Sequence, residues 1–333
     1  MKKSVIFILI FNFVFIAFGS KAVLMPGLNK PIYMIVDNGQ IFIADFPHMY
    51  IYSAEDFKLK KKFGKKGEGP QEFMGYILFE VTPDRLVLDS QGKHSYYTRK
   101  GEFIKEVPFK TGGRYKVLGK NYAAYGYYQE DRIFFMAVNV VDHNFKKIKE
   151  VYRYPDWYQE QGPKKGIHVI DYFRTRCLTS GNRLVVRDMK DFKFYIYNEN
   201  GEKVADISRD YEKLKVTERD KENYHNYIKI HPNFKQFYEN QKGNIKFYKY
   251  FPPVRDFLLV KDRMYIFTYL KKEGKTEFFI YDLNGKFLKR TFIELNHIDM
   301  IDCGPTWVDK GYLYQLAENE DEEEWELRIT EIK

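Results

Sequence analysis

The sequence contains little cysteine, only two residues in 333. So few thiols exclude a disulfide-rich scaffold and a zinc module built on several cysteines. Common enzyme motifs are missing as well. There is no Gly-x-Ser-x-Gly nucleophile elbow, and the glycines at 64, 67 and 69 lack the Lys-Ser/Thr ending of a phosphate-binding loop. The seven histidines show no spacing typical of metal ligands. We therefore expect no cofactor, no metal ion and no catalytic residue.

Long apolar runs are scarce too, and the single one stands at the N-terminus. After Met1-Lys2-Lys3, the segment Ser4–Phe18 is apolar apart from Asn12, and small residues follow it. A charged start, an apolar middle and a small-residue cleavage zone are typical of a Sec signal peptide. A membrane-spanning helix needs about 20 apolar residues, more than this run contains. We predict a signal peptide rather than an anchor.

The cleavage zone sets the expected compartment. Its small residues fit cleavage after Gly19 or Ala22, and we take residues 1–22 as the signal peptide and residues 23–333 as the mature domain. No cysteine lies near this zone, which excludes a lipid-modified N-terminus at a lipobox. We expect a periplasmic or extracellular protein with no membrane span after cleavage.

Positive charge is only slightly in excess. The 55 Lys and Arg residues against 46 Asp and Glu give +9, which falls to +6 once Lys2, Lys3 and Lys21 are removed. The basic run Lys58–Lys66 resembles a nucleic-acid patch, but a secreted chain meets no nucleic acid. Lysines on the edge of a sheet discourage its pairing with another sheet. We expect a solvated strand edge there and no nucleic-acid partner.

Tyrosine and phenylalanine are abundant, with 28 and 29 residues, and they fall in a repeating layout. Six segments share one order: a polar turn, a short apolar strand, a variable stretch, and a second strand that often ends in an Asn-Gly or Lys-Gly turn. The intervals between the units are 45, 47, 51, 80 and 49 residues. A period of about 40 to 50 residues predicts blades or solenoid units. Aligned on the first strand residue, the units begin at Ile41, Leu86, Ile133, Leu184, Met264 and Leu313.

Each unit also contains a glycine hairpin or an additional strand. Hairpins occupy 96–109, 192–207 and 277–293, and apolar strands precede the polar turns at 76–81 and 256–260. Four antiparallel strands repeated six times predict an all-β, six-bladed β-propeller. A large sandwich or a pair of small β domains is the alternative that regular short strands leave open.

The last unit lacks one strand, because only Trp325–Ile332 follows its first hairpin arm. A segment near Ala22–Met25 would supply the missing strand and close the ring, leaving no open sheet edge.

The interval of 80 residues indicates an insertion between blades four and five. Residues 208–250 have a helical pattern: Thr217 and Asp220 form a capping pair, the following stretch lacks Gly and Pro, and a second short helix is expected over Asn233–Gln241. Connectors between blades all lie on one face of a propeller. We expect the insertion to overhang that face as a lid, or to cover a blade edge as a structural pad.

The segment Gly64-Lys65-Lys66-Gly67-Glu68-Gly69-Pro70-Gln71-Glu72-Phe73 follows the first unit. It resembles the G-x-x-G-x-G-P-x-x-F connector of NHL-type repeats. With the repeat layout, it makes the chain similar to the bacterial secreted 6-bladed beta-propeller family, whose relatives include NHL-repeat and TolB-like propellers. The connector occurs once, and Gln71 stands where glycine is frequent. The resemblance implies a six-bladed ring over essentially the whole mature chain.

Arginine and aromatic residues gather in the segments predicted to reach the insertion-bearing face. Such side chains suit planar anionic or sugar-like ligands through paired hydrogen bonds and stacking, although each also fits a salt bridge or a gap between blades. We expect an unidentified small molecule, glycan or protein as the ligand. The candidate ligand-binding residues lie in inter-blade loops and on innermost strands: Arg114, Tyr115, Trp157, His168, Arg174, Arg176, Arg255 and Trp307.

Cys177 and Cys303 fall at matching positions on the innermost strands of blades four and six. Blades two apart place these strands across the channel, beyond the Cα separation of about 7 Å that a disulfide allows. We expect both thiols to be free and buried.

The sequence favours a monomeric, secreted or periplasmic binding module that is not an enzyme, and it leaves two alternatives. A propeller enzyme of the calcium-dependent lactonase, hydrolase or lyase type would need carboxylates at the channel mouth, for which Asp171, Asp256 and Asp302 are the plausible acids. A structural subunit of a cell-envelope assembly would bind a membrane partner through the insertion.

Overall fold

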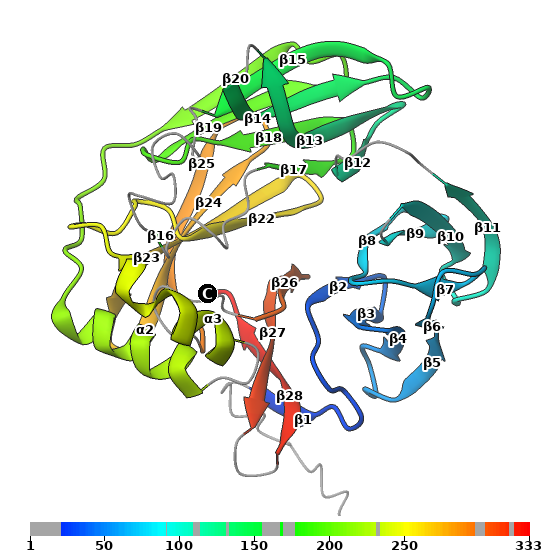
Figure 1. Cartoon of the computed structure of the whole chain (residues 1–333), viewed down its shortest axis with the longest axis horizontal. Coiled ribbons are helices and arrows are strands. Elements are labelled where there is room, and N and C mark those ends of the chain that lie inside the picture. The colour runs from blue at the N-terminus through cyan, green and yellow to red at the C-terminus, as the bar shows by residue number, and fades with distance from the viewer. Residues whose placement is uncertain are drawn as a thin grey trace, which may run out of the picture.

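Six four-stranded antiparallel sheets form a ring in the computed structural model (Figure 1). It describes residues 21–90, 92–108, 114–130, 133–154, 167–168, 177–230, 234–296, 304–319 and 323–333. The chain is a six-bladed β-propeller with one blade per sheet, which confirms the predicted fold class.

In blades one to five the four strands follow one another along the chain, from the innermost outward, whereas the outermost strand of blade six is β1. Blades one to three consist of β2 (Tyr33–Asp37), β3 (Gln40–Asp45), β4 (His48–Ser53) and β5 (Leu59–Phe63); β8 (Leu78–Val81), β9 (Arg85–Ser90), β10 (Lys93–Thr98) and β11 (Phe103–Pro108); and β12 (Arg114–Leu118), β13 (Asn121–Glu130), β14 (Ile133–Val141) and β15 (Lys147–Tyr154). Blades four to six consist of β17 (Cys177–Ser180), β18 (Arg183–Arg187), β19 (Lys193–Asn198) and β20 (Lys203–Ser208); β22 (Asp256–Val260), β23 (Arg263–Lys272), β24 (Lys275–Asp282) and β25 (Phe287–Glu294); and β26 (Thr306–Asp309), β27 (Tyr312–Asn319), β28 (Glu324–Glu331) and β1 (Lys21–Leu24).

Tight turns set the register within the blades. Two residues join the first strand to the second in five blades. In blade two, three residues separate β8 from β9, but the Thr82 amide bonds to the Arg85 carbonyl, so the turn itself is again two residues, Pro83 and Asp84. The hairpins predicted from glycine join third and fourth strands, and Gly101, Gly201 and Gly285 have φ of 81°, 77° and 86° there. Such left-handed backbone is readily adopted by glycine, which has no Cβ. The three hairpin predictions are confirmed.

The ring is closed by a strand from the other end of the sequence. β1 pairs antiparallel with β28, from Lys21 opposite Ile329 to Leu24 opposite Glu326. This pairing gives blade six its fourth strand and confirms the closing strand predicted near residues 22–25.

The apolar core lies between the faces of adjacent blades. Phe42, Phe79 and Leu88 are buried between blades one and two, and Phe194 and Phe257 are buried between blades four and five. Burying one such side chain contributes roughly 1.5–3 kcal/mol. The abundant aromatic residues therefore hold neighbouring blades together.

The sequence pattern misplaces the third unit. Ile133 opens β14, the third strand of its blade, whereas the second strand begins at Asn121. Gln129 and Glu130 end β13, and the polar sequence between β13 and Ile133 resembles the turn that precedes a second strand in the other units. As a consequence Arg114 and Tyr115, predicted to lie in an inter-blade loop, belong to β12, the innermost strand of blade three.

The glycine-rich connector after blade one is a compact turn. β6 (Lys65–Lys66) and β7 (Glu72–Phe73) pair in parallel, and a Cβ on Gly64 would lie 2.4 Å from the ring of buried Phe73. Gln71 has a φ of 60°, in the left-handed region that favours glycine. This conformation explains why glycine is frequent at that position of the motif.

The lysine run before this connector is the outer edge of blade one. β5 is the outermost strand of its sheet, and Lys60, Lys61 and Lys62 are exposed. The prediction of a solvated strand edge is confirmed.

The insertion between blades four and five forms a small lobe. It contains α2 (Glu218–Ile230), α3 (Lys235–Gln241), a 3-10 turn η2 (Lys242–Asn244) and β21 (Ile245–Lys246). The Thr217 hydroxyl accepts a hydrogen bond from the Asp220 amide, and an Asp220 carboxylate oxygen accepts one from the Thr217 amide, which forms the predicted capping box. Lys215 bridges to Tyr250, so that the two ends of the lobe are tied together at a neck.

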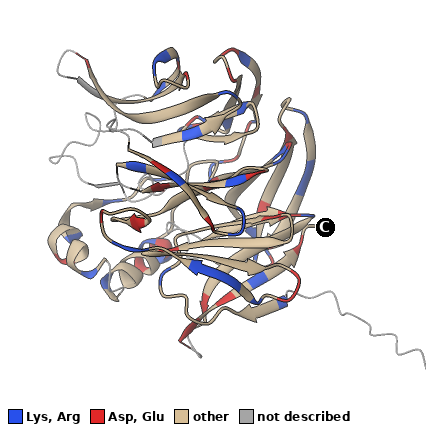
Figure 2. Ribbon diagram, turned by 90° about the vertical axis from the view of Figure 1, so that its right-hand side faces the viewer, with Lys and Arg blue, Asp and Glu red and all other residues tan. Residues whose placement is uncertain are grey.

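In Figure 2, the helices lie at one side of the ring, and basic and acidic residues are interspersed along the ribbon. Among the described residues, no helix is long and apolar enough to cross a membrane.

Candidate functional site

The innermost strands of the six blades surround the ring axis. β2 contacts β8 and β26, β17 contacts β12 and β22, and β22 contacts β26. The Glu80 carboxylate of β8 accepts a hydrogen bond of 3.0 Å from the Val117 amide of β12, which completes the circuit. A side chain on any of these strands therefore lies near the axis.

Three of the predicted ligand-binding residues have described side chains: Tyr115, Arg255 and Trp307. They lie in three different blade interfaces, so the structure does not bring them together. Arg114 and His168 are placed by their backbone alone, and Trp157, Arg174 and Arg176 lie outside the described residues. Of the two cysteines, Cys177 is buried without a disulfide, as predicted, and Cys303 lies outside the described residues.

Tyr115 packs between blades two and three. Its ring centroid lies 6.5 Å from His94 of β10 and 5.0 Å from Phe145, in edge-on arrangements. These contacts fit an aromatic that fills the space between two blades.

Arg255 fastens the chain where it returns from the insertion to blade five. Its side chain is buried, and its guanidinium lies 5.6 Å from the ring centroid of Tyr269 on β23. Its carbonyl accepts a hydrogen bond of 3.1 Å from Arg187 of β18, which also donates to the Val254 carbonyl. Arg187 is 1% exposed. The two arginines thus have structural contacts at the interface of blades four and five.

Trp307 joins an aromatic group on the innermost strands. Its ring stands perpendicular to that of Tyr33 on β2, with centroids 6.5 Å apart, and Tyr33 in turn lies 5.1 Å from Phe79 on β8. The indole N–H of Trp307 is shielded from solvent and makes no hydrogen bond with a described residue. Trp307 therefore lies near the axis, as the sequence predicts for an innermost strand.

Two charged residues join this group, and the sequence analysis did not identify them. Glu80 and Lys116 sit on β8 and β12, and both are half-buried although their strands are innermost. Partial exposure at this depth requires space for solvent next to them. Charge interactions link Tyr33 to Lys116, Glu80 and Asp256, which come from blades three, two and five. We call Tyr33, Glu80, Lys116, Asp256 and Trp307 the axial cluster.

Strand register explains why these side chains meet. Glu80, Lys116 and Trp307 are each the third residue before the two-residue turn, opposite Val87, Ala123 and Tyr314. The equivalent residues in the other blades are apolar: Ile35, Leu178 and Leu258. At this position, where three blades have an apolar residue, the other three have the carboxylate of Glu80, the ammonium of Lys116 and the indole of Trp307.

The surroundings shift the ionisation of this cluster. Burial raises the pKa of Glu80, and Lys116 and the hydrogen bond from Val117 only partly oppose the shift. Burial lowers the pKa of Lys116, but nearby Tyr33 and Glu80 reverse the effect and leave it raised. Burial also raises the pKa of Tyr33. An acid and a base that face one ring axis form a polar centre in otherwise apolar packing.

The connectors of blades three and four meet on one face of the ring. β16 (Ile167–His168) pairs in parallel with β21 of the insertion, His168 lying opposite Lys246. The insertion therefore carries at least one strand partner from another connector. His168 is the predicted ligand-binding residue that this pairing brings to the insertion.

The insertion rests on blade five. Its core contains Val216, Tyr224, Ile228 and Phe251, and Tyr269 of β23 packs against Phe251 with ring centroids 4.4 Å apart. These contacts fit a structural pad, and an overhang across the ring axis stays a prediction.

A buried hydrogen-bond network fixes the start of the insertion. The Tyr211 hydroxyl lies 2.9 Å from the Thr268 hydroxyl and 2.8 Å from the Glu277 carboxylate. Glu277 is fully buried and pairs with Arg290 at 2.6 Å. Since a buried carboxylate is tolerated only when it is paired, this network ties the insertion to blade five.

The acids that a metal-dependent propeller enzyme would need are only partly described. The Asp256 carboxylate accepts a hydrogen bond of 2.8 Å from the Phe257 amide, whereas Asp171 and Asp302 lie outside the described residues. No group of three metal-ligating side chains occurs within the described part of the chain.

No protein-family model and no curated protein matches the sequence. Solved structures do match. A putative exported protein from Bacteroides fragilis has 13% sequence identity and a TM-score of 0.55, over 94% of this chain and 96% of its own. A member of the DUF4221 family from Bacteroides vulgatus has 13% identity and a TM-score of 0.49 over the same shares. The similarity to the first structure supports the fold over nearly the whole chain.

Proposed function

We propose that the chain is a secreted or periplasmic propeller that binds a ligand or protein partner on its insertion-bearing face and catalyses no reaction. The observation that carries the proposal is the insertion itself. It is a lobe with its own core, closed at a neck, anchored on blade five and paired with the connector of blade three through β21 and β16. A long ordered insertion on a rigid scaffold is a common place for binding residues.

Export is part of the proposal. The N-terminal layout supports it, as does the likeness to a protein described as a putative exported protein. We propose cleavage after Gly19, because Lys21 and Ala22 are paired within β1 and a cut after Ala22 would remove half of that strand. The glycine-rich connector supports a relationship to the NHL and TolB-like propellers.

The neck allows a clean test of the binding face. Residues 217–248 are replaced by a short Gly-Ser linker, which leaves the Lys215–Tyr250 bridge and blade five in place. The wild type and this variant are screened by thermal shift against panels of glycans and small metabolites. We expect at least one compound to raise the melting temperature of the wild type and to leave the variant unchanged.

A matched control substitutes Lys60, Lys61 and Lys62 of β5 by serine, away from the insertion, and should keep the response. Compounds that shift the wild type and the insertion variant equally would contradict the proposed face. Stabilisation by calcium that disappears in Asp171→Ala or Asp302→Ala would instead support a metal-dependent propeller enzyme.

A further inference from the structure

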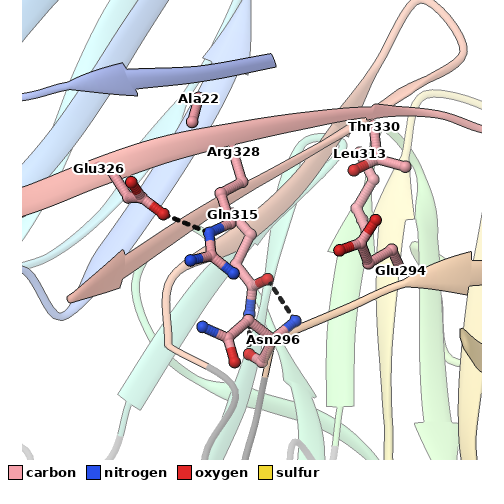
Figure 3. Close-up of a pocket in the computed structure, with 8 residues that line it drawn as sticks. All are labelled: Ala22, Glu294, Asn296, Leu313, Gln315, Glu326, Arg328 and Thr330. Carbon is pink, nitrogen blue, oxygen red and sulfur yellow. Dashed lines mark hydrogen bonds and ion pairs between the residues drawn. The ribbon is translucent and has the colours of Figure 1, made fainter. Parts of the chain in front are cut away.

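A hollow of about 290 Å³ lies between blades five and six, at the strands that close the ring (Figure 3). Blade six contributes Gln315 from β27 and Glu326 and Arg328 from β28. The facing wall is formed by Glu294 and Asn296, at the outer end of blade five. No described residue of the insertion lines it, so the hollow is separate from the proposed binding face.

The hollow is polar where neighbouring blades otherwise meet through apolar side chains. Directly opposed residues of four strands form a row across blade six: Ala22, Arg328, Gln315 and Thr306. Ala22 is too small to fill the space in front of β1. The row therefore leaves an opening with polar groups on its floor.

Two of the floor residues, Gln315 and Glu326, make hydrogen bonds to other residues of the protein. The Gln315 side chain accepts a hydrogen bond of 2.9 Å from the Asn296 amide and donates one to the Asn296 carbonyl. Glu326 is buried and accepts hydrogen bonds from Nε of Arg328 and, at 3.1 Å, from Asn319. These contacts hold the two blades together and fix the Arg328 side chain.

Two charged groups have bonding capacity left. Arg328 uses only its Nε, and its two terminal nitrogens bond to no residue that the structure describes. Glu294 makes no hydrogen bond or ion pair within the described chain. In Figure 3, the Arg328 guanidinium and the Glu294 carboxylate stand on opposite sides of the hollow. A positive group and a negative group thus lie on opposite sides of a hollow that the described residues leave open.

We propose that this hollow binds a small zwitterion, with its carboxylate on Arg328 and its ammonium on Glu294. A guanidinium with two free terminal nitrogens matches a carboxylate in a paired hydrogen bond. The volume stands near the lower end of the about 300–1,000 Å³ typical of ligand pockets, which suits a molecule the size of an amino acid. No aromatic side chain is among the described lining residues, so a sugar would have no ring to stack on.

Occupancy of the hollow would join blade five to the strands that close the ring. A ligand bound to the folded state stabilises it according to its concentration relative to Kd. Binding is therefore measured as a rise in melting temperature and by titration calorimetry.

Probes of graded length test the charge spacing. Glycine, β-alanine and 4-aminobutyrate carry both charges at increasing separation, whereas acetate, methylammonium and glucose carry one charge or none. We expect one of the three zwitterions to bind, and the single-charge probes and glucose to give no heat at the same concentrations. Binding of acetate alone as strong as that of the zwitterions, binding of glucose, or no binding of any zwitterion would overturn the proposal.

Substitutions identify the groups. Glu294→Gln keeps the shape of an exposed side chain and should weaken binding at least tenfold, as should Arg328→Met. The variant Glu331→Gln changes an exposed residue on β28, the strand that carries Arg328, and should bind as the wild type does. Unchanged affinity in Glu294→Gln would overturn the proposal even if Arg328→Met fails to fold. The variant without the insertion should keep this binding, which separates the result from the test of the proposed function.

Discussion

Blade two contains several buried polar side chains. Asp89, Lys93 and His94 are all at most 9% exposed, and Glu80 lies on the same blade. Lys93 is compensated, because its ammonium donates to the Gly69 carbonyl at 2.7 Å and pairs with Glu106 at 2.9 Å. His94 is buried beside the ring of Tyr115. Its ionisation should therefore influence stability.

Burial lowers the pKa of His94 to about 4. In the unfolded chain this histidine binds a proton near pH 6.5, whereas in the folded chain it stays neutral down to about pH 4. The contribution of His94 to the free energy of unfolding is therefore complete above pH 6.5 and decreases as the pH falls toward 4. We expect His94→Phe, which keeps a ring against Tyr115, to remove about 2 kcal/mol of the loss in unfolding free energy between pH 7.5 and 4.5.

Urea unfolding at the two pH values checks this, with His143→Phe, an exposed histidine, as the control. An equal loss in the wild type and in His94→Phe would show that His94 is not the group that titrates.

Single residues also mark the limit of sequence-based prediction. Trp307 was found because β26 follows the common pattern. Lys116 was missed because the polar sequence before Ile133 has the pattern of the turn that precedes a second strand, which assigns the residues of β12 to a loop. Glu80 was missed because one acid in a short apolar strand does not stand out until all six blades are aligned on their turns.

Among the elements, the insertion shows which features local sequence determines. Its capping box and its glycine-free stretch depend on neighbouring residues, and both helices form where they were predicted. Its anchoring on blade five depends on Tyr211, Glu277 and Arg187, which come from separate parts of the chain. No local pattern connects such residues, so the docking of the insertion could not be predicted.

Arg187 offers a test of this anchoring. We expect Arg187→Met to lower the free energy of unfolding by about 2–4 kcal/mol, because two carbonyl groups before β22 lose a charged hydrogen-bond donor in a buried site. Arg183→Met on the same strand should cost much less, because among the described residues the Arg183 guanidinium donates only to the exposed Asn182 side chain. Chemical denaturation of both variants compares the two. A similar small cost in each would mean that Arg187 does not carry the return of the insertion.

At the scale of the whole molecule, the strand count was predictable because the propeller repeats one pattern. Five of the six residues at which the units begin, all except Ile133, lie at the start of a second strand. Closure was predictable for a different reason: a three-stranded last blade needs a partner, and the chain has a short strand left over at its start. The hollow between blades five and six was not predictable, because it depends on the distance between two sheets.

The closing strand gives a prediction about the mature N-terminus. A chain covering 20–333 keeps all four residues of β1, whereas one covering 23–333 loses the pairs of Lys21 and Ala22 with Ile329 and Arg328. We expect the shorter chain to be less stable by about 1–3 kcal/mol, since each backbone hydrogen bond contributes roughly 0.5–1.5 kcal/mol. Thermal and urea unfolding of both chains measure the difference.

Replacing Lys21 and Ala22 by Gly-Ser in the longer chain separates backbone pairing from the side chains. Mass spectrometry of the exported protein should find Ser20 as its first residue. Equal stability of the two chains, or a mass that begins at Val23, would contradict cleavage after Gly19.

The pairing of β1 with β28 also determines when the ring can close during synthesis. The two strands are roughly 300 residues apart in the sequence, and synthesis proceeds at about 5–20 residues per second. The first strand therefore waits about 15 to 60 seconds before the ribosome has produced its partner. During that time the five earlier blades have the residues they need, but the ring does not. Newly made chain thus stays open until the last blade is complete, and closure is a late event in its synthesis.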